Sequence, residues 1–172
     1  WHQPPGAELT RPGLRENFTA IPGNPVPTDA RVMKLASRDD VCLRAAYWPG
    51  ADAAKGTAII LQGRTEMIEK YFETIAELRS RGYAAATFDW RGQGLSDRQL
   101  DDNYKGHVWD FSEYHSDLDA FLDQCMRPNL PPPYTLLAHS MGAHIGLRYL
   151  RDQPQSFDRA VLCSPMAYIN TA

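Results

Sequence analysis

A serine with small residues on both sides is the clearest candidate for chemistry in this sequence. Ser140 lies in the stretch LLAHSMGAH, residues 136–144, where an apolar run gives way to a helical pattern. A serine hydroxyl becomes a nucleophile when a base removes its proton, and a sharp strand-to-helix turn exposes that hydroxyl above the carboxyl edge of a sheet. Such a turn is crowded, and Ala138 and Gly142 supply the small residues that it needs. We therefore favour Ser140 as a nucleophile over the other interpretation, a serine that only caps a helix.

A loop earlier in the chain has the composition expected for the stabilisation of an oxyanion. Residues 61–66, LQGRTE, follow a short apolar run and precede a helical pattern. Gly63 permits close approach of the backbone, the N–H of Arg64 can donate to an oxyanion, and Thr65 can cap the next helix. An ordinary capped loop is the alternative for this segment taken alone. Its combination with Ser140 favours the oxyanion interpretation.

Alternating strand and helix patterns predict the elements that would position these two loops. Two runs, Arg31–Ala36 and Val41–Trp48, predict an N-terminal β-hairpin. The further predicted strands are Thr57–Leu61, Tyr83–Phe88, Tyr134–Ala138 and Arg159–Cys163. The predicted helices cover residues 67–78, residues 110–125 with Asp110 and Glu113 as reciprocal caps, and a segment after Ser140 that ends before Pro154. This alternation predicts an α/β fold with a mostly parallel sheet and helices on both faces.

Two segments fall outside this alternation. Residues 1–30 are rich in Pro and Gly and show no sustained periodicity, which predicts an extended arm that wraps the domain or is partly disordered. Residues 127–133, RPNLPPP, are expected to form a stiff linker into the strand Tyr134–Ala138.

Composition and charge exclude several classes of function. The net charge is −3 and no basic run stands out, which argues against a nucleic-acid surface. Three cysteines without CxxC spacing predict buried free thiols instead of a metal site or a disulfide framework: Cys42, Cys125 and Cys163. No apolar run approaches the roughly 20 residues of a membrane span. The chain begins with Trp1, and no targeting signal can be recognised.

Four motifs, in order, resemble the α/β-hydrolases, and more narrowly the branch that contains lysophospholipases and monoacylglycerol lipases. They are LQGRTEMIEKY, FDWRGQGLSDR, GHVWDFSEYHSDLDAFL and AHSMGAHIGLRYL, and the resemblance covers about residues 31–169. It implies that residues 31–172 are the N-terminal part of an α/β-hydrolase domain that is incomplete at its C-terminal end, without the lid and the last strands. It also implies that Ser140 accepts the acyl group and that the backbone N–H groups of Met141 and Arg64 bind the oxyanion. Many relatives have histidine at the position of Gln62, and this difference should matter little because the donor is a backbone group.

The resemblance further implies an Asp and a His that follow the serine in chain order. The only histidine after Ser140 is His144, and the geometry of the helix points it away from the hydroxyl. We expect the triad acid and histidine to lie beyond this sequence. The residues expected to have structural or solvated roles are the histidines His107, His115 and His139, the helix carboxylates Asp110, Asp117 and Asp119, and the turn residues Asp89 and Arg91.

The expected function is hydrolysis of lysophospholipids or monoacylglycerols through an acyl-enzyme at Ser140, with no metal and no cofactor. The resemblance implies a small lipid ester as substrate. We further expect a cytoplasmic protein that can contact a membrane transiently, and neither nucleic acid nor an obligate protein as partner. The Arg64 side chain could contact a phosphate or glycerol head group, or pair with a neighbour such as Glu66. The alternative function is a non-catalytic binding domain of hydrolase shape, if the natural chain ends at Ala172.

Overall fold

A single mixed sheet organises the chain. The structure, a computed structural model, describes residues 18–51 and 54–167. Within these residues one six-stranded sheet has the order β1-β2-β4-β3-β5-β6. Its strands are β1 (Arg31–Ala36), β2 (Cys42–Trp48), β3 (Thr57–Leu61), β4 (Ala84–Phe88), β5 (Tyr134–His139) and β6 (Arg159–Cys163). The pairs β1–β2 and β2–β4 are antiparallel, whereas β3 pairs in parallel with β4 and β5, and β5 with β6. The predicted hairpin and mostly parallel sheet are confirmed.

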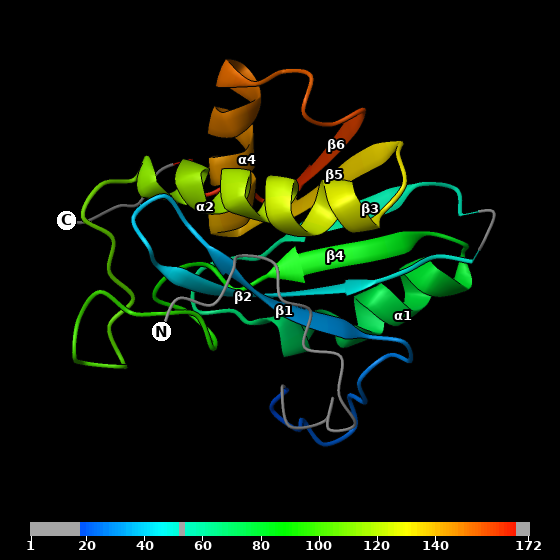
Figure 1. The fold of residues 1–172 in the computed structure, drawn as a ribbon, viewed down its shortest axis with the longest axis horizontal. Coiled ribbons are helices and arrows are strands. Elements are labelled where there is room, and N and C mark those ends of the chain that lie inside the picture. The colour runs from blue at the N-terminus through cyan, green and yellow to red at the C-terminus, as the bar shows by residue number, and fades with distance from the viewer. Residues whose placement is uncertain (1–17, 52–53, 168–172) are drawn as a thin grey trace.

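Helices cover both faces of the sheet, as the alternation predicted. After β3 come a 3₁₀ turn, η2 (Ile68–Tyr71), and α1 (Phe72–Ser80). After β4 come α2 (Glu113–Phe121), a π-helical segment η3 (Leu122–Met126) and the short α3 (Arg127–Asn129), and β5 leads directly into α4 (Ser140–Asp152). The side chains of α1 pack into one core cluster and those of α2 and α4 into another, on opposite sides of the sheet (Figure 1). Every residue of β3 and β4 is buried, as expected of central strands with helices on both faces.

The structure corrects the prediction for residues 127–133. The stiff linker was expected from Arg127, but Arg127–Asn129 continue the helical path as α3, and the extended backbone begins at Leu130. Pro128 lies in α3 and has no backbone N–H to donate to the preceding helical turn, and the helix ends one residue later. The Asn129 side-chain amide also donates to the carbonyl of Cys125, at 2.7 Å, and stabilises the helical turn.

The predicted cap of α2 is confirmed on one side only. The Glu113 carboxylate accepts the backbone N–H of Asp110 at 3.1 Å, as expected of the reciprocal glutamate. The Asp110 carboxylate, however, accepts the backbone N–H of Ser112 at 2.8 Å and forms a turn that precedes the helix.

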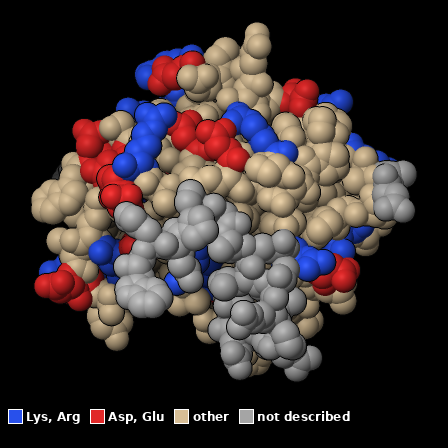
Figure 2. All heavy atoms as spheres, in the orientation of Figure 1, with Lys and Arg blue, Asp and Glu red and all other residues tan. Residues whose placement is uncertain are grey.

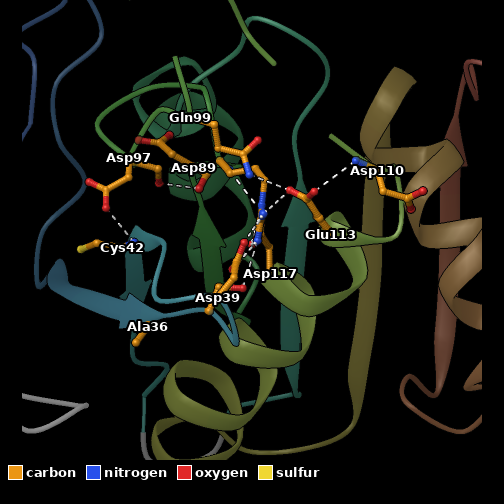
Figure 3. Close-up of polar contacts among 12 residues, drawn as sticks. Ala36, Asp39, Cys42, Asp89, Asp97, Gln99, Asp110, Glu113 and Asp117 are labelled. Atoms are coloured by element: carbon orange, nitrogen blue, oxygen red, sulfur yellow. Dashed lines mark hydrogen bonds and ion pairs between the residues drawn. The ribbon is translucent and has the colours of Figure 1, made fainter. Parts of the chain in front are cut away.

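A buried arginine overturns the expectation that Asp117 is solvated. Arg91 is almost completely buried, and its guanidinium group donates to the carboxylate of Asp117 at 2.6 and 2.9 Å and to that of Asp39 at 2.7 Å. Glu113 also pairs with Arg91. Figure 3 shows the carboxylates of Asp39, Glu113 and Asp117 converging from different segments. Asp117 is fully buried because α2 places it against the loop after β4, and its helical position alone did not reveal this.

A second buried ion network connects the loop after β4 to η2, the turn that precedes α1. The Arg44 guanidinium lies between the carboxylates of Glu69 and Asp89, at 2.7 and 2.5 Å, and all three side chains are buried. Asp89 also accepts the backbone N–H groups of Ile68 at 3.0 Å and Leu95 at 2.9 Å. Asp89 thus satisfies buried groups in two loops, as the sequence indicated for its turn.

The segment before the hairpin packs on the α1 side of the sheet. Phe18 is buried and contacts the rings of Trp48 and Phe72 at centroid distances of 6.3 and 5.2 Å. The backbone N–H of Thr19 donates to Glu69 at 2.8 Å. Residues 1–17 of the expected N-terminal arm lie outside the described residues.

The surface and the cysteines complete this description. Lys and Arg side chains alternate with Asp and Glu on the face shown in Figure 2, so neither sign of charge dominates there. No helix among the described residues is long and apolar enough to cross a membrane. The prediction of buried thiols is confirmed for Cys125 but is wrong for Cys163, which is exposed on β6. Cys42 is half-buried.

Candidate active site

Ser140 lies at a strained turn between β5 and α4. Its φ is +51°, in the left-handed region that side chains other than Gly rarely adopt. Because β3 and β5 are parallel neighbours, with Leu61 paired to Ala138, their carboxyl ends meet at one edge of the sheet. The turn at Ser140 and the loop after Leu61 therefore lie side by side, which is the arrangement that the sequence predicted for a nucleophile and an oxyanion loop.

Gly142 permits this close approach. A Cβ atom at Gly142 would lie 2.4 Å from the carbonyl oxygen of Gln62 and 2.5 Å from that of Leu61. The first turn of α4 consequently packs directly against the backbone at the end of β3. One turn later, a Cβ atom at Gly146 would lie 3.9 Å from the Cβ of Ala138, so two small residues face each other where α4 packs on β5.

Glu66 holds one side of the candidate oxyanion loop, residues 61–66. Its carboxylate accepts the backbone N–H of Gly63 at 2.6 Å and the hydroxyl of Tyr71 at 2.6 Å, pairs with Lys70, and lies 3.4 Å from Nδ1 of His139. Burial alone would raise the pKa of Glu66, but the hydrogen bonds from Lys70, Tyr71 and Gly63 outweigh burial and lower the pKa to about 2. Glu66 is therefore ionised at neutral pH and acts as a fixed acceptor inside the loop.

Gln93 holds the other side of the loop. Its side-chain oxygen accepts the backbone N–H of Thr65 at 2.8 Å, and its amide nitrogen donates to the carbonyl of Gly63 at 3.1 Å. The N–H groups of Gly63 and Thr65 are thus both engaged. Among the hydrogen bonds of the described residues, none uses the N–H of Arg64, which lies between them. The loop leaves one donor available at the position where the sequence predicted an oxyanion donor.

The expectation that Thr65 caps the following helix is wrong. Its hydroxyl donates to the carbonyl of Arg64 at 2.6 Å, and its backbone has a φ of +59°. The N–H of Ile68, the first residue of η2, is instead satisfied by Asp89.

A cavity of about 510 Å³ adjoins the two candidate oxyanion donors, Arg64 and Met141, which both line it. Ser140 itself is not among the lining residues, although Met141 follows it directly. The apolar part of the lining is formed by Met67, Val108, Phe111, Tyr114, Met141 and Met166. A volume and lining of this kind suit an apolar ligand of moderate size.

None of the histidines in the described ranges forms a hydrogen bond with Ser140. His139 contacts Glu66 behind the loop, and His144 packs edge-on against Phe111 at a centroid distance of 5.3 Å. His107 packs against Trp109 and His115 against Tyr149 in the same manner. The structure therefore brings Ser140, Met141, Arg64, Gly63, Ala138 and Gly142 together and places no described histidine in hydrogen-bond contact with the serine.

Sequence reasoning missed the two residues that hold the loop, Glu66 and Gln93. The spacing of Gly63 and Glu66 offered a weak signal, because a glutamate three residues after a loop N–H can reach back to accept it. Gln93 offered none, since it lies 28 residues from Thr65, in the turn for which only Asp89 and Arg91 were expected to have structural roles.

Comparison with known proteins places the chain in a family. Residues 52–172 match the family described as "Serine aminopeptidase, S33". Lysophospholipase L2 of Escherichia coli is 39% identical over 108 residues, which are 63% of this chain and 32% of that protein. Monoglyceride lipase of Saccharomyces cerevisiae is 28% identical over 110 residues, 60% of this chain and 33% of that protein.

Solved structures show the same fold. An esterase from Exiguobacterium antarcticum superposes with a TM-score of 0.64 and 21% identity, over 78% of this chain and 46% of that one. The chain spans only about a third of the length of the curated relatives above. The matched residues include the whole parallel part of the sheet together with the turn at Ser140 and the loop around Arg64. The chain therefore belongs to the serine aminopeptidase S33 family and has an α/β-hydrolase fold, of which it covers an N-terminal part.

Proposed function

We propose that the protein hydrolyses carboxylic esters of lipids, with Ser140 as the nucleophile. The observation that carries the proposal is the left-handed backbone of Ser140 at the carboxyl edge of β5, beside a loop with an available N–H at Arg64. Backbone strain of this kind persists where the surrounding structure enforces it, and it is common at reactive residues. Relatives named as a lysophospholipase and a monoglyceride lipase support lipid esters as the substrate class.

In this mechanism the Ser140 hydroxyl oxygen attacks the ester carbonyl carbon while a base takes the hydroxyl proton. The carbonyl oxygen becomes an anion that accepts hydrogen bonds from the backbone N–H groups of Met141 and Arg64. The intermediate then collapses, the C–O bond to the glycerol side breaks, and the leaving alcohol takes the proton from the base. Water repeats the attack on the acyl-enzyme and releases the fatty acid, which regenerates the Ser140 hydroxyl.

The first turn of α4 supports the charge that develops. The N–H groups in the first turn of a helix have no partner within the helix, and the N-terminal end of the helix carries partial positive charge. Met141 follows Ser140 in this turn and is buried against the cavity. The apolar lining of the cavity suits the acyl chain, because burial of methylene groups is favourable at about 0.8 kcal/mol each.

We infer that the general base comes from a part of the protein outside this chain. The described histidines have other contacts, and the chain spans about a third of its curated relatives. The same holds for the carboxylate that would orient the base.

Labelling with a fluorophosphonate tests the proposal. The full natural protein should gain the mass of one phosphonyl group, and Ser140→Ala should abolish the adduct because the activated hydroxyl is gone. Substitution of the neighbouring Ser164→Ala is a matched control that should leave labelling intact. Labelling that persists in Ser140→Ala, or its absence from a folded full-length protein, would show that Ser140 is not the nucleophile.

A further inference from the structure

An arginine at the mouth of the cavity has no carboxylate partner among the described residues. Glu66, the neighbour that could have paired with Arg64, is engaged by Lys70, Tyr71 and the N–H of Gly63. Arg64 is exposed, and neither an ion pair nor a side-chain hydrogen bond is formed by its guanidinium group within the described ranges. Its charge is therefore available to a ligand, at the same residue whose backbone N–H is the proposed oxyanion donor.

A second arginine, Arg98, lines the same cavity, and no described carboxylate pairs with it. The Arg98 guanidinium donates to the carbonyl oxygens of Gly92 and Gly94, the latter at 3.3 Å, and it forms no ion pair within the described residues. Carbonyl oxygens satisfy some donors without neutralising the charge. A guanidinium has five N–H donors in a planar fork, so Arg98 is fixed in place with donors to spare.

The balance of charge around the cavity is positive. Glu66 is the acidic residue of its described lining, and Lys70 neutralises it from outside the lining. Arg64 also acts on the phenol of Tyr114, which lines the same cavity: burial and the charge of Asp117 raise the pKa of Tyr114, and the Arg64 charge opposes that increase.

We propose that Arg64 and Arg98 bind the phosphate of a lysophospholipid head group and make the site selective for phosphate-bearing monoacyl lipids over neutral monoacylglycerols. This inference rests on the proposed function. In a lysophospholipid the phosphate lies one glycerol unit away from the ester carbonyl, and an arginine side chain has a comparable length. A single residue, Arg64, can therefore contact both groups, with its backbone N–H at the carbonyl oxygen and its guanidinium at the phosphate. Arginine suits this task because its planar fork matches two phosphate oxygens at once.

The test compares two substrates with the same acyl chain, a lysophosphatidylethanolamine and a monoacylglycerol, on the full natural protein. The readout is the ratio of their kcat/KM values. Arg64→Ala retains the backbone donor and removes the guanidinium, so the ratio should fall by about tenfold to a hundredfold, as expected for a hydrogen-bonded charge pair. Arg98→Ala should lower the ratio in the same direction, and Arg64→Lys should lower it less, because the charge remains without the fork.

Arg81→Ala is the matched control. Arg81 is an exposed arginine after the end of α1, at the opposite edge of the sheet, and it pairs only with Glu77 among the described residues. This variant should keep the wild-type ratio. An unchanged ratio in both Arg64→Ala and Arg98→Ala, in protein that still hydrolyses both lipids, would overturn the inference and leave the proposed function intact. Loss of hydrolysis in Ser140→Ala tests the proposed function separately.

A third substrate distinguishes recognition of the phosphate group from attraction to the net negative charge of the lipid. Lysophosphatidylglycerol carries a net negative charge, whereas lysophosphatidylethanolamine carries the same phosphate with a compensating ammonium group. If the phosphate is the ligand, Arg64→Ala should lower kcat/KM for both lipids by similar factors. A loss confined to the anionic lipid would overturn phosphate recognition in favour of general electrostatic attraction.

Discussion

Replacing Gly142 with alanine should disable the site at a small cost in stability. The added Cβ would lie 2.4 and 2.5 Å from two backbone carbonyl oxygens and 2.7 Å from a backbone carbon, at the end of β3. None of these atoms can rotate away, so the first turn of α4 must move. A retreat of about 0.6 Å is needed to lengthen the closest contact from 2.4 to 3.0 Å.

The energetic and the catalytic consequences of this movement differ in size. Overpacking costs about 1–3 kcal/mol, and the better helix propensity of alanine offsets up to about 1 kcal/mol of it. The net loss of stability should therefore be about 1–2 kcal/mol. The same movement carries the N–H of Met141 away from the N–H of Arg64. Misplacement on the ångström scale costs about a hundredfold in rate, so we expect fluorophosphonate labelling of Ser140 to slow by tenfold to a hundredfold.

Gly146→Ala provides the matched control on the same helix. A Cβ atom there would meet the end of the Leu136 side chain at 3.0 Å and other side-chain carbons beyond 3.5 Å, and it would meet no strand backbone. This variant should unfold at or slightly above the wild-type temperature and be labelled at the wild-type rate. The assay pairs thermal unfolding with the rate of adduct formation in the full natural protein. Equal labelling rates for Gly142→Ala and Gly146→Ala would refute the reasoning that the contact of α4 with β3 sets the oxyanion site.

Three further predictions concern the residues that hold the loops. The pKa of Glu66 is lower in the folded than in the unfolded state, so the unfolded state binds more protons between pH 4.5 and about 2. The ionised Glu66 therefore stabilises the fold fully above that range, and this contribution is lost as the pH falls through it. In Glu66→Gln, the free energy of unfolding by urea should depend less on pH in that range, and an unaltered pH profile would contradict the assignment. Gln93→Ala should slow labelling of the serine, whereas Gln124→Ala, which removes a glutamine of η3 that forms two hydrogen bonds with the backbone of Ala36, should not. Equal rates would remove the role assigned to Gln93. Arg91→Met should destabilise the protein by about 3–5 kcal/mol by leaving Asp117 buried without its cation, and partial recovery in the double variant with Asp117→Asn, measured by denaturant unfolding, would be the expected signature.

The strands and the central helices could be predicted because their signals are local. Thr57–Leu61 is a continuous apolar run, and the structure buries all of it under helices on both faces. The helix at Ser140 follows from small residues and apolar positions that recur at helical spacing. Gly142 could be recognised for the same reason, since its steric role depends on the turn that contains it.

The roles of polar residues could not be predicted because they depend on distant partners. Asp117 was expected to face solvent from its helical position, and a salt bridge with Arg91, 26 residues earlier, buries it instead. Gln93 is a loop residue with no periodicity, and only the folded chain brings it to Thr65. Burial of a polar side chain is favourable only when its donors and acceptors find hydrogen-bond partners, and the folded chain as a whole determines whether they do.

The left-handed backbone at Ser140 places stability in opposition to the chemistry proposed for this position. A side chain in this region of φ costs about 1–2 kcal/mol relative to glycine, and glycine would adopt a φ of +51° with little cost. Selection for a stable fold alone would thus favour glycine at position 140. If Ser140 is the nucleophile, as proposed, glycine at position 140 would stabilise the turn and abolish the activity, so stabilising substitutions in this protein should be sought away from that turn.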